Sequence, residues 1–86
     1  MDRARIIEGL KKIISENLEL EVPAELNESV RTWEDLGVDS IMAMQLIVYI
    51  EEDFGIEVPE DEIEEGVFGT IGSLADFIER LQKATA

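Results

Sequence analysis

The sequence contains no cysteine and no histidine. Their absence excludes disulfide bonds, zinc sites of the Cys/His type, thiol nucleophiles and imidazole acid–base catalysis. We therefore expect neither an enzyme nor a metal site. The chain has 86 residues, of which 45% are hydrophobic. It is predicted to form one small domain over residues 1–86, because chains divide into several cores only at about two or three times this length.

Long hydrophobic runs are also missing. No uninterrupted apolar stretch approaches the roughly 20 residues that a membrane-spanning helix requires. The chain starts Met1-Asp2-Arg3 without an apolar signal segment. These observations predict a soluble protein of the cytoplasm, which we expect to be a monomer.

Basic residues are absent from the middle of the chain. Between Thr32 and Glu79 the sequence has fourteen acidic residues and no Lys or Arg, so this stretch carries the whole net charge of −14. One face or end of the fold is therefore predicted to be strongly electronegative. Nucleic acid and anionic membranes are excluded as partners, because both require basic contacts. Partners are expected to present basic patches.

Hydrophobic residues recur at spacings of three and four in three segments, which predicts three amphipathic helices. These helices are expected over Asp2 to Leu18, Ser40 to Asp53 and Ile71 to Leu81, with a polar tail from Lys83 to Ala86. Pro23 follows the first helix, and Gly55 is expected to end the second. Asp39 and Thr70 are the predicted N-caps of the second and third helices.

The segments between these helices are less regular. Residues 20–39 are predicted to form a long loop, held to the core by scattered apolar side chains: Leu20, Val22, Leu26, Val30, Trp33 and Leu36. Trp33 is expected on the core or its rim. Residues 60–67 are long enough for one or two helical turns. No alternating strand pattern occurs, so the predicted fold class is all-α, with three main helices and one short helix.

The candidate site is the stretch Gly37-Val38-Asp39-Ser40-Ile41, which places a hydroxyl at the start of a helix after a long loop. With Asp39 as the N-cap, Ser40 takes the first helical position and its hydroxyl is free to point into solvent. A phosphate ester there would lie beside unpaired backbone N–H groups and the positive end of the helix dipole. Taken alone, the stretch also fits an ordinary serine at a helix start.

The stretch Glu34-Asp35-Leu36-Gly37-Val38-Asp39-Ser40-Ile41 resembles the Asp-Leu-Gly-x-Asp-Ser-Leu motif of acyl carrier proteins and of the related peptidyl and aryl carrier domains. The similarity continues through Glu51 to Pro59 and includes the first and last helices. It implies a four-helix carrier bundle with a long first loop. It also implies that Ser40 receives 4′-phosphopantetheine from coenzyme A through a phosphopantetheinyl transferase. Such a carrier holds its cargo as a thioester and does not catalyse.

The resemblance further implies docking of partner enzymes on the second helix. These partners are acyl- or aminoacyl-loading enzymes, acyltransferases and synthases with basic docking surfaces. The residues expected in the docking surface are Asp39, Ile41, Met42, Met44, Gln45, Val48, Glu51 and Glu52. Among these, Met42, Met44 and Val48 leave the core face of the helix and are expected to be exposed hydrophobic side chains.

Two positions depart from the pattern of fatty-acid carriers. Met42 and Gln45 stand where such carriers usually have acids, and a Gln five residues after the serine is more similar to peptidyl carriers. The stretch Glu51 to Pro59 is instead similar to acyl carriers. This mixture favours a stand-alone carrier for specialised biosynthesis of polyketides, nonribosomal peptides or natural products that combine the two. A carrier for fatty-acid synthesis or for D-alanyl transfer is the alternative.

Functions of other classes compete with a carrier. An acidic helical adaptor would keep the carrier fold without a prosthetic group, but it has no need of a modifiable serine in an intact Leu-Gly-x-Asp-Ser context. An enzyme with paired carboxylates would need a large apolar pocket to raise a carboxylate pKa, and the sequence predicts none. The acidic run Asp61 to Gly66 does not fit a calcium loop, because Ile63 takes the third ligand position and Gly72 the twelfth.

Overall fold

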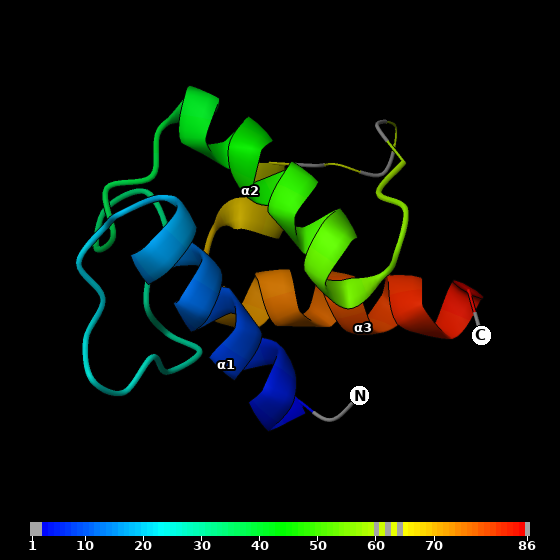
Figure 1. Ribbon diagram of the computed structural model, residues 1–86, viewed down its shortest axis with the longest axis horizontal. Coiled ribbons are helices and arrows are strands. Elements are labelled where there is room, and N and C mark those ends of the chain that lie inside the picture. The colour runs from blue at the N-terminus through cyan, green and yellow to red at the C-terminus, as the bar shows by residue number, and fades with distance from the viewer. Residues whose placement is uncertain (1–2, 60, 62, 64, 86) are drawn as a thin grey trace.

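Three α-helices form the frame of the molecule (Figure 1). The computed structural model describes residues 3–59, 61, 63 and 65–85. Its elements are α1 (Arg3–Lys12), η1 (Ile13–Asn17), α2 (Ser40–Phe54), η3 (Glu65–Phe68) and α3 (Ile71–Thr85). Within the described residues, the one strand-like feature is an isolated bridge between Arg31 and Thr70. The predicted all-α fold class is confirmed.

The first predicted helix is divided into two geometries. The α-helical part α1 passes directly into the π-helical turn η1, which ends at Asn17, close to the predicted end; Asp2 lies outside the described residues. The π turn was not predicted, because the apolar spacing that buries Ile13 and Ile14 also fits a continuous α-helix. After this turn the chain reverses through Glu19, which has a positive φ of 55°.

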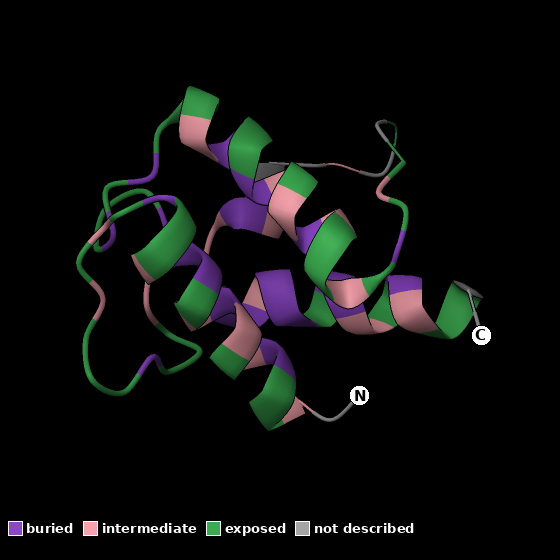
Figure 2. Cartoon of the chain, viewed as in Figure 1, coloured by how far each residue is buried: buried purple, intermediate pink, exposed green. Residues whose placement is uncertain are grey.

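Helix α2 starts and stops as predicted. Asp39 caps its N-terminus, and Gly55 follows its last residue in the left-handed conformation with φ 64°. The N–H of Ile56 then donates to the carbonyl oxygen of Glu51 at 3.3 Å, which satisfies one of the last free carbonyls of the helix. Figure 2 shows buried and exposed residues alternating around this helix, as expected for an amphipathic element.

The predictions for the last third of the chain need two corrections. The short helix expected over residues 60–67 is a single 3₁₀ turn at Glu65–Phe68, and residues 60, 62 and 64 lie outside the described part of the chain. The polar tail expected from Lys83 is wrong, because α3 continues to Thr85. Lys83 in the last turn favours the helix, since a cation stabilises the C-terminal end of the helix dipole.

Thr70 caps α3 as predicted. Its Oγ1 accepts a hydrogen bond from the N–H of Ser73 at 3.1 Å, and the Ser73 hydroxyl oxygen accepts one from the N–H of Thr70 at 3.0 Å. This reciprocal pair is a capping box with serine in the place usually taken by glutamate. Two of the free N–H groups at the start of α3 are thereby satisfied.

The long loop between η1 and α2 is held to the core as predicted by Leu26 and Leu36, which are buried. Leu20, Val22 and Val30 are partly buried and pack against the same core. Arg3 adds a polar clamp: its guanidinium binds Glu28 of the loop at 2.5 Å and Asp76 of α3 at 2.6 Å. These carboxylates raise the pKa of Arg3 further above its usual range. The loop therefore has fixed contacts to both α1 and α3.

The core lies between the three helices and takes side chains from each of them. Helix α1 packs against α3, and η1 packs against α2. Its largest fully buried side chains include Ile6, Leu10, Leu46, Ile50, Leu74 and Ile78. None of the described helices is long and apolar enough to cross a membrane.

Candidate functional site

The start of α2 has the geometry that the sequence predicts. The carboxylate of Asp39 accepts a hydrogen bond from the N–H of Met42 at 2.8 Å, and the Asp39 carbonyl accepts one from Ala43 at 2.8 Å. Gly37 allows the chain to enter this cap, because its φ of 77° is strained for other residues. The hydroxyl of Ser40 is therefore placed at the first residue of the helix.

The segment before this cap is held by one arginine. The N–H of Arg31 donates to the Asp35 carboxylate at 2.8 Å, while its guanidinium contacts Asp35 at 3.2 Å and Glu34 at 2.5 Å. The backbone hydrogen bond, followed by the guanidinium, lowers the pKa of Asp35. Leu36 and Val38 are buried on either side of Gly37. The residues leading to Ser40 are thus fixed by both charge and packing.

Ser40 differs from the other three serines of the chain. Its side chain is exposed, and its hydroxyl makes no hydrogen bond within the described residues. The hydroxyl of Ser15 donates to the Lys12 carbonyl, that of Ser29 to the Asn27 side chain and that of Ser73 to the Val67 carbonyl. Ser40 therefore has a hydroxyl that is available for an external reaction.

An apolar pocket adjoins the Ser40 side chain. Its volume is about 590 Å³, and it lies between the loop before α2, α2 itself and the η3 region. The residues that line it are Trp33, Ser40, Ala43, Met44, Ile47, Ile63, Gly66, Phe68 and Gly69. The expectation that the fold has no large apolar pocket is wrong. Hydrophobic periodicity predicts which side of a helix faces the core, but it does not give the distances between α2, the loop before it and η3. Among the described residues that line it, none is a carboxylate.

The predicted docking residues are distributed around α2. Ile41 and Met44 are each 70% exposed and Val48 is 51% exposed, as expected for hydrophobic side chains outside the core. Asp39, Gln45 and Glu52 are also exposed. Together, Asp39, Ile41, Met44, Gln45, Val48 and Glu52 form what we call the α2 outer face.

Two predicted docking residues have other contacts. Met42 is only partly exposed and packs against the core, so the expectation that it is an exposed hydrophobic residue is wrong. Its long unbranched side chain reaches the core from a position beside the apolar face. Glu51 is half-buried, and its carboxylate accepts a hydrogen bond from the N–H of Val58 at 2.9 Å. Glu51 therefore holds the turn after α2.

Sequence reasoning missed Thr32. This residue is fully buried, and its hydroxyl donates to the carbonyl oxygen of Phe68. Its backbone N–H also donates to the Gly69 carbonyl at 3.3 Å, and its carbonyl accepts from Val38 at 3.0 Å. No sequence pattern marks a lone threonine in a polar loop as buried. Trp33, which was expected on the core or its rim, follows Thr32, lines the pocket beside Ser40 and has 43% of its surface exposed.

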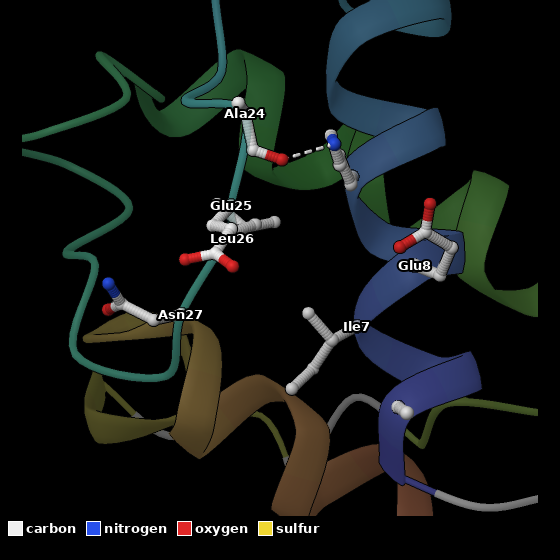
Figure 3. Close-up of a pocket in the computed structure, with 8 residues that line it drawn as sticks. Ile7, Glu8, Ala24, Glu25, Leu26 and Asn27 are labelled. Atoms are coloured by element: carbon white, nitrogen blue, oxygen red, sulfur yellow. Dashed lines mark hydrogen bonds between the residues drawn. The ribbon is translucent and has the colours of Figure 1, made fainter.

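A second pocket lies between α1 and the long loop (Figure 3). Ile7 and Glu8 line it from α1, and residues 24–27 line it from the loop. The Lys11 ammonium closes one side by donating to the Ala24 carbonyl at 2.6 Å. Ser40 is not among its lining residues, so this pocket is separate from the candidate site.

Comparisons with known proteins show the family to which the chain belongs. Residues 8–78 match the family model described as phosphopantetheine attachment site. The chain is 46% identical over 82 residues to the acyl carrier protein AsbD of Bacillus anthracis, covering 95% of this chain and 90% of that protein. It is 35% identical over 74 residues to the acyl carrier protein of Wolinella succinogenes, covering 86% of this chain and 93% of that protein.

Solved structures have the same fold. The crystal structure of an acyl carrier protein from Thermotoga maritima superposes with a TM-score of 0.83 at 22% identity, covering 100% of this chain and 96% of that one. The solution structure of a holo acyl carrier protein from Nitrosomonas europaea gives a TM-score of 0.62 at 26% identity, covering 98% and 96% of the two chains. The chain therefore belongs to the phosphopantetheine-binding family of acyl carrier proteins, which carry acyl groups and are not catalysts.

Proposed function

We propose that Ser40 is the attachment site for 4′-phosphopantetheine in a single carrier domain that serves specialised biosynthesis. The main observation in support of this attachment site is the exposed hydroxyl of Ser40, at the first residue of α2, which makes no hydrogen bond to any other described residue. The cap formed by Asp39 uses only the N–H of Met42, so Ser40 is not needed as a capping group. Its replacement would leave the helix start intact.

The residues around Ser40 are suited to a phosphodiester bond and to the pantetheine chain that this bond would attach. Beyond the Asp39 cap, the first turn of α2 has no acidic residue, and the helix dipole favours a phosphate there. In the attachment step, the Ser40 oxygen bonds to the phosphorus that bears pantetheine in coenzyme A. The phosphoanhydride bond breaks, adenosine bisphosphate leaves and the hydroxyl proton passes to the transferase or to water. When bound, the prosthetic group supplies a thiol that holds an acyl or aminoacyl group as a thioester.

The test of attachment is the intact mass after incubation with coenzyme A and a broad-specificity phosphopantetheinyl transferase. We expect one added phosphopantetheine on the wild type and none on Ser40→Ala. Ser73→Ala and Ser29→Ala serve as controls and should still be labelled. Circular dichroism should show that Ser40→Ala keeps its helical content. Labelling of Ser40→Ala would overturn the assignment.

A role in specialised biosynthesis is supported by the composition of the α2 outer face. It includes exposed Gln45, where fatty-acid carriers usually have an acid, and three exposed hydrophobic side chains. Apolar contacts contribute more to affinity than exposed ion pairs do, so this face should select partners that offer an apolar patch with a basic rim. Fatty-acid enzymes that depend on acidic contacts should bind this face weakly.

The pathway assignment can be tested with loading enzymes of two kinds. The holo protein would be offered to a malonyltransferase of fatty-acid synthesis and to an adenylating loading enzyme of a specialised pathway. We expect poor malonyl loading, improved by Gln45→Glu, which restores an acid without touching the core. Efficient malonyl loading of the wild type would instead favour a carrier for fatty-acid synthesis. Loading with D-alanine alone would favour a D-alanyl carrier.

A further inference from the structure

Methionine is the only sulfur-containing residue type in the chain. The sequence has Met1, Met42 and Met44 and no cysteine. Peroxides oxidise the thioether of methionine to a sulfoxide, and a cysteine thiol, where present, competes for the same oxidants. Because this polypeptide has no thiol, the methionines supply its only oxidisable sulfur atoms. Met1 lies outside the described residues, whereas the structure describes both Met42 and Met44.

These two methionines lie two residues apart on α2 and differ in burial. Met44 is 70% exposed. Met42 is only partly exposed and packs against the hydrophobic core. Oxidation adds a polar oxygen to the sulfur, which is costly where the side chain is packed against apolar neighbours and costs little where it lies in solvent. Met44 is therefore the methionine that a dissolved oxidant attacks first.

Met44 is also close to the candidate attachment site. It follows Ser40 by four residues on the same helix, a spacing that places two side chains one above the other with Cβ atoms about 5–6 Å apart. Both residues line the same apolar pocket. An enzyme that brings its reactive groups to the Ser40 hydroxyl therefore also contacts Met44.

Oxidation would change the polarity of this contact. The thioether of methionine is flexible and polarizable, and it adapts to an apolar partner surface. A sulfoxide is polar and accepts hydrogen bonds, so an apolar partner surface would deprive its oxygen of water without replacing the hydrogen bonds. In the free protein, an oxygen on the exposed Met44 side chain stays in solvent. Oxidation of Met44 is therefore expected to affect partner binding and to leave the fold unchanged.

We propose that Met44 is a site of reversible oxidation by hydrogen peroxide, and that its sulfoxide slows the attachment of 4′-phosphopantetheine at Ser40. In the forward step, the Met44 sulfur bonds to one peroxide oxygen, the O–O bond breaks and water leaves. The sulfur is thereby oxidised and the peroxide is reduced. In the reverse step, the sulfoxide oxygen leaves as water while a dithiol reductant becomes a disulfide. The effect on attachment rests on the proposed function of Ser40, whereas the selective oxidation of Met44 does not.

The first experiment measures which methionine is oxidised. The apo protein would be treated with hydrogen peroxide, and fragment masses would place each added oxygen. We expect Met44 to be oxidised at least about threefold faster than Met42 in the folded protein, and at the same rate in concentrated urea, where burial no longer distinguishes them. Equal rates in the folded protein, or the same difference in urea, would overturn the proposal.

The second experiment measures attachment from coenzyme A by a broad-specificity phosphopantetheinyl transferase, after the peroxide has been removed. We expect kcat/KM for the protein oxidised at Met44 to be about tenfold lower than for the untreated protein, because the transferase would bury an unsatisfied oxygen. Methionine sulfoxide reductases for both sulfoxide epimers should restore the rate. Circular dichroism should be the same before and after oxidation. An unchanged rate, or a slower rate accompanied by loss of helix, would contradict the proposal.

Variants identify the methionine responsible, and each is compared with its own untreated form. Peroxide should not change the attachment rate of Met44→Leu, which has no sulfur at this position. It should slow attachment to Met42→Leu as much as to the wild type, which makes this variant the matched control. A peroxide effect that persists in Met44→Leu would assign it to another residue and overturn the proposal. Failure of the untreated wild type to gain the mass of phosphopantetheine would instead overturn the proposed attachment at Ser40.

Discussion

The hydroxyl of Thr32 donates a hydrogen bond to the carbonyl oxygen of Phe68, which is 36 residues away in the sequence. Thr32 is fully buried, so this bond is shielded from water. It joins the loop that leads to Ser40 to the last residue of η3. Two segments that carry the walls of the same pocket are thereby held together.

Replacing Thr32 with valine tests this relationship, because valine keeps the shape but removes the hydroxyl. We expect the free energy of unfolding to fall by about 1–3 kcal/mol, since the carbonyl of Phe68 would lose the threonine hydroxyl as a hydrogen-bond partner. Urea unfolding followed by circular dichroism measures this change. Thr32→Ser keeps the donor and should cost less. If valine were tolerated as well as serine, the hydrogen bond would not contribute to stability.

This relationship also marks the limit of what the sequence predicts. The ends of α2 were predictable because Asp39, Ser40 and Gly55 act through local chemistry: a capping carboxylate and a left-handed glycine. The burial of Thr32 depends on Phe68 and Gly69, which only the tertiary fold brings near. Local patterns therefore locate the candidate serine, while the pocket beside it requires the arrangement of distant segments.

The same distinction applies within α2. Helical spacing correctly predicted that Met44 and Val48 leave the core, since each lies outside the buried stripe of Ala43, Leu46 and Ile50. It failed for Met42, whose flexible side chain packs against the core from an intermediate position. Periodicity gives the direction of a residue on a helix, but not how far a long side chain reaches.

The reversal at Glu19 gives a prediction about stability. Its φ of 55° lies in the left-handed region, where a side chain costs about 1–2 kcal/mol and glycine costs none. Glycine also loses more freedom on folding, so we expect Glu19→Gly to raise the free energy of unfolding by about 0.5–1 kcal/mol. Gly55→Ala, at φ 64°, should have the opposite effect. Destabilisation by both substitutions would show that Glu19 makes contacts that outweigh its backbone strain.

The Arg31–Asp35 contact predicts a dependence on pH. Because folding lowers the pKa of Asp35, its contribution to stability is present above the ordinary aspartate value of 3.8 and is lost as the pH falls towards the folded value. The Asp35 titration, followed by NMR, should have a midpoint below 3.8 in the wild type. Arg31→Gln should raise this midpoint only in part, because the backbone N–H of residue 31 is the largest cause of the shift. A return to the ordinary value in that variant would assign the shift to the guanidinium instead.

The α2 outer face gives the last prediction, which concerns partner recognition. Ile41 is 70% exposed and Val48 is 51% exposed, and neither lines the pocket beside Ser40. Contiguous exposed hydrophobic side chains are a feature of surfaces that a partner covers. Burying one of them in an interface contributes on the order of 1.5–3 kcal/mol, whereas an exposed ion pair contributes about 0–1 kcal/mol. The apolar residues should therefore dominate affinity, and the acids should set the encounter rate.

Truncating both residues, as Ile41→Ala with Val48→Ala, should lower kcat/KM for loading by the cognate partner by about a hundredfold or more. The free energy of unfolding should change by less than about 0.5 kcal/mol per site, because both side chains are largely exposed. Glu52→Lys is the contrasting variant: it should slow association at low salt and lose its effect as salt rises. Met42→Glu is unsuitable for this purpose, because Met42 packs against the core and a charge there would also destabilise the fold. Loading of the double alanine variant at the wild-type rate, with Glu52→Lys strongly impaired, would show that charge rather than apolar contact selects the partner.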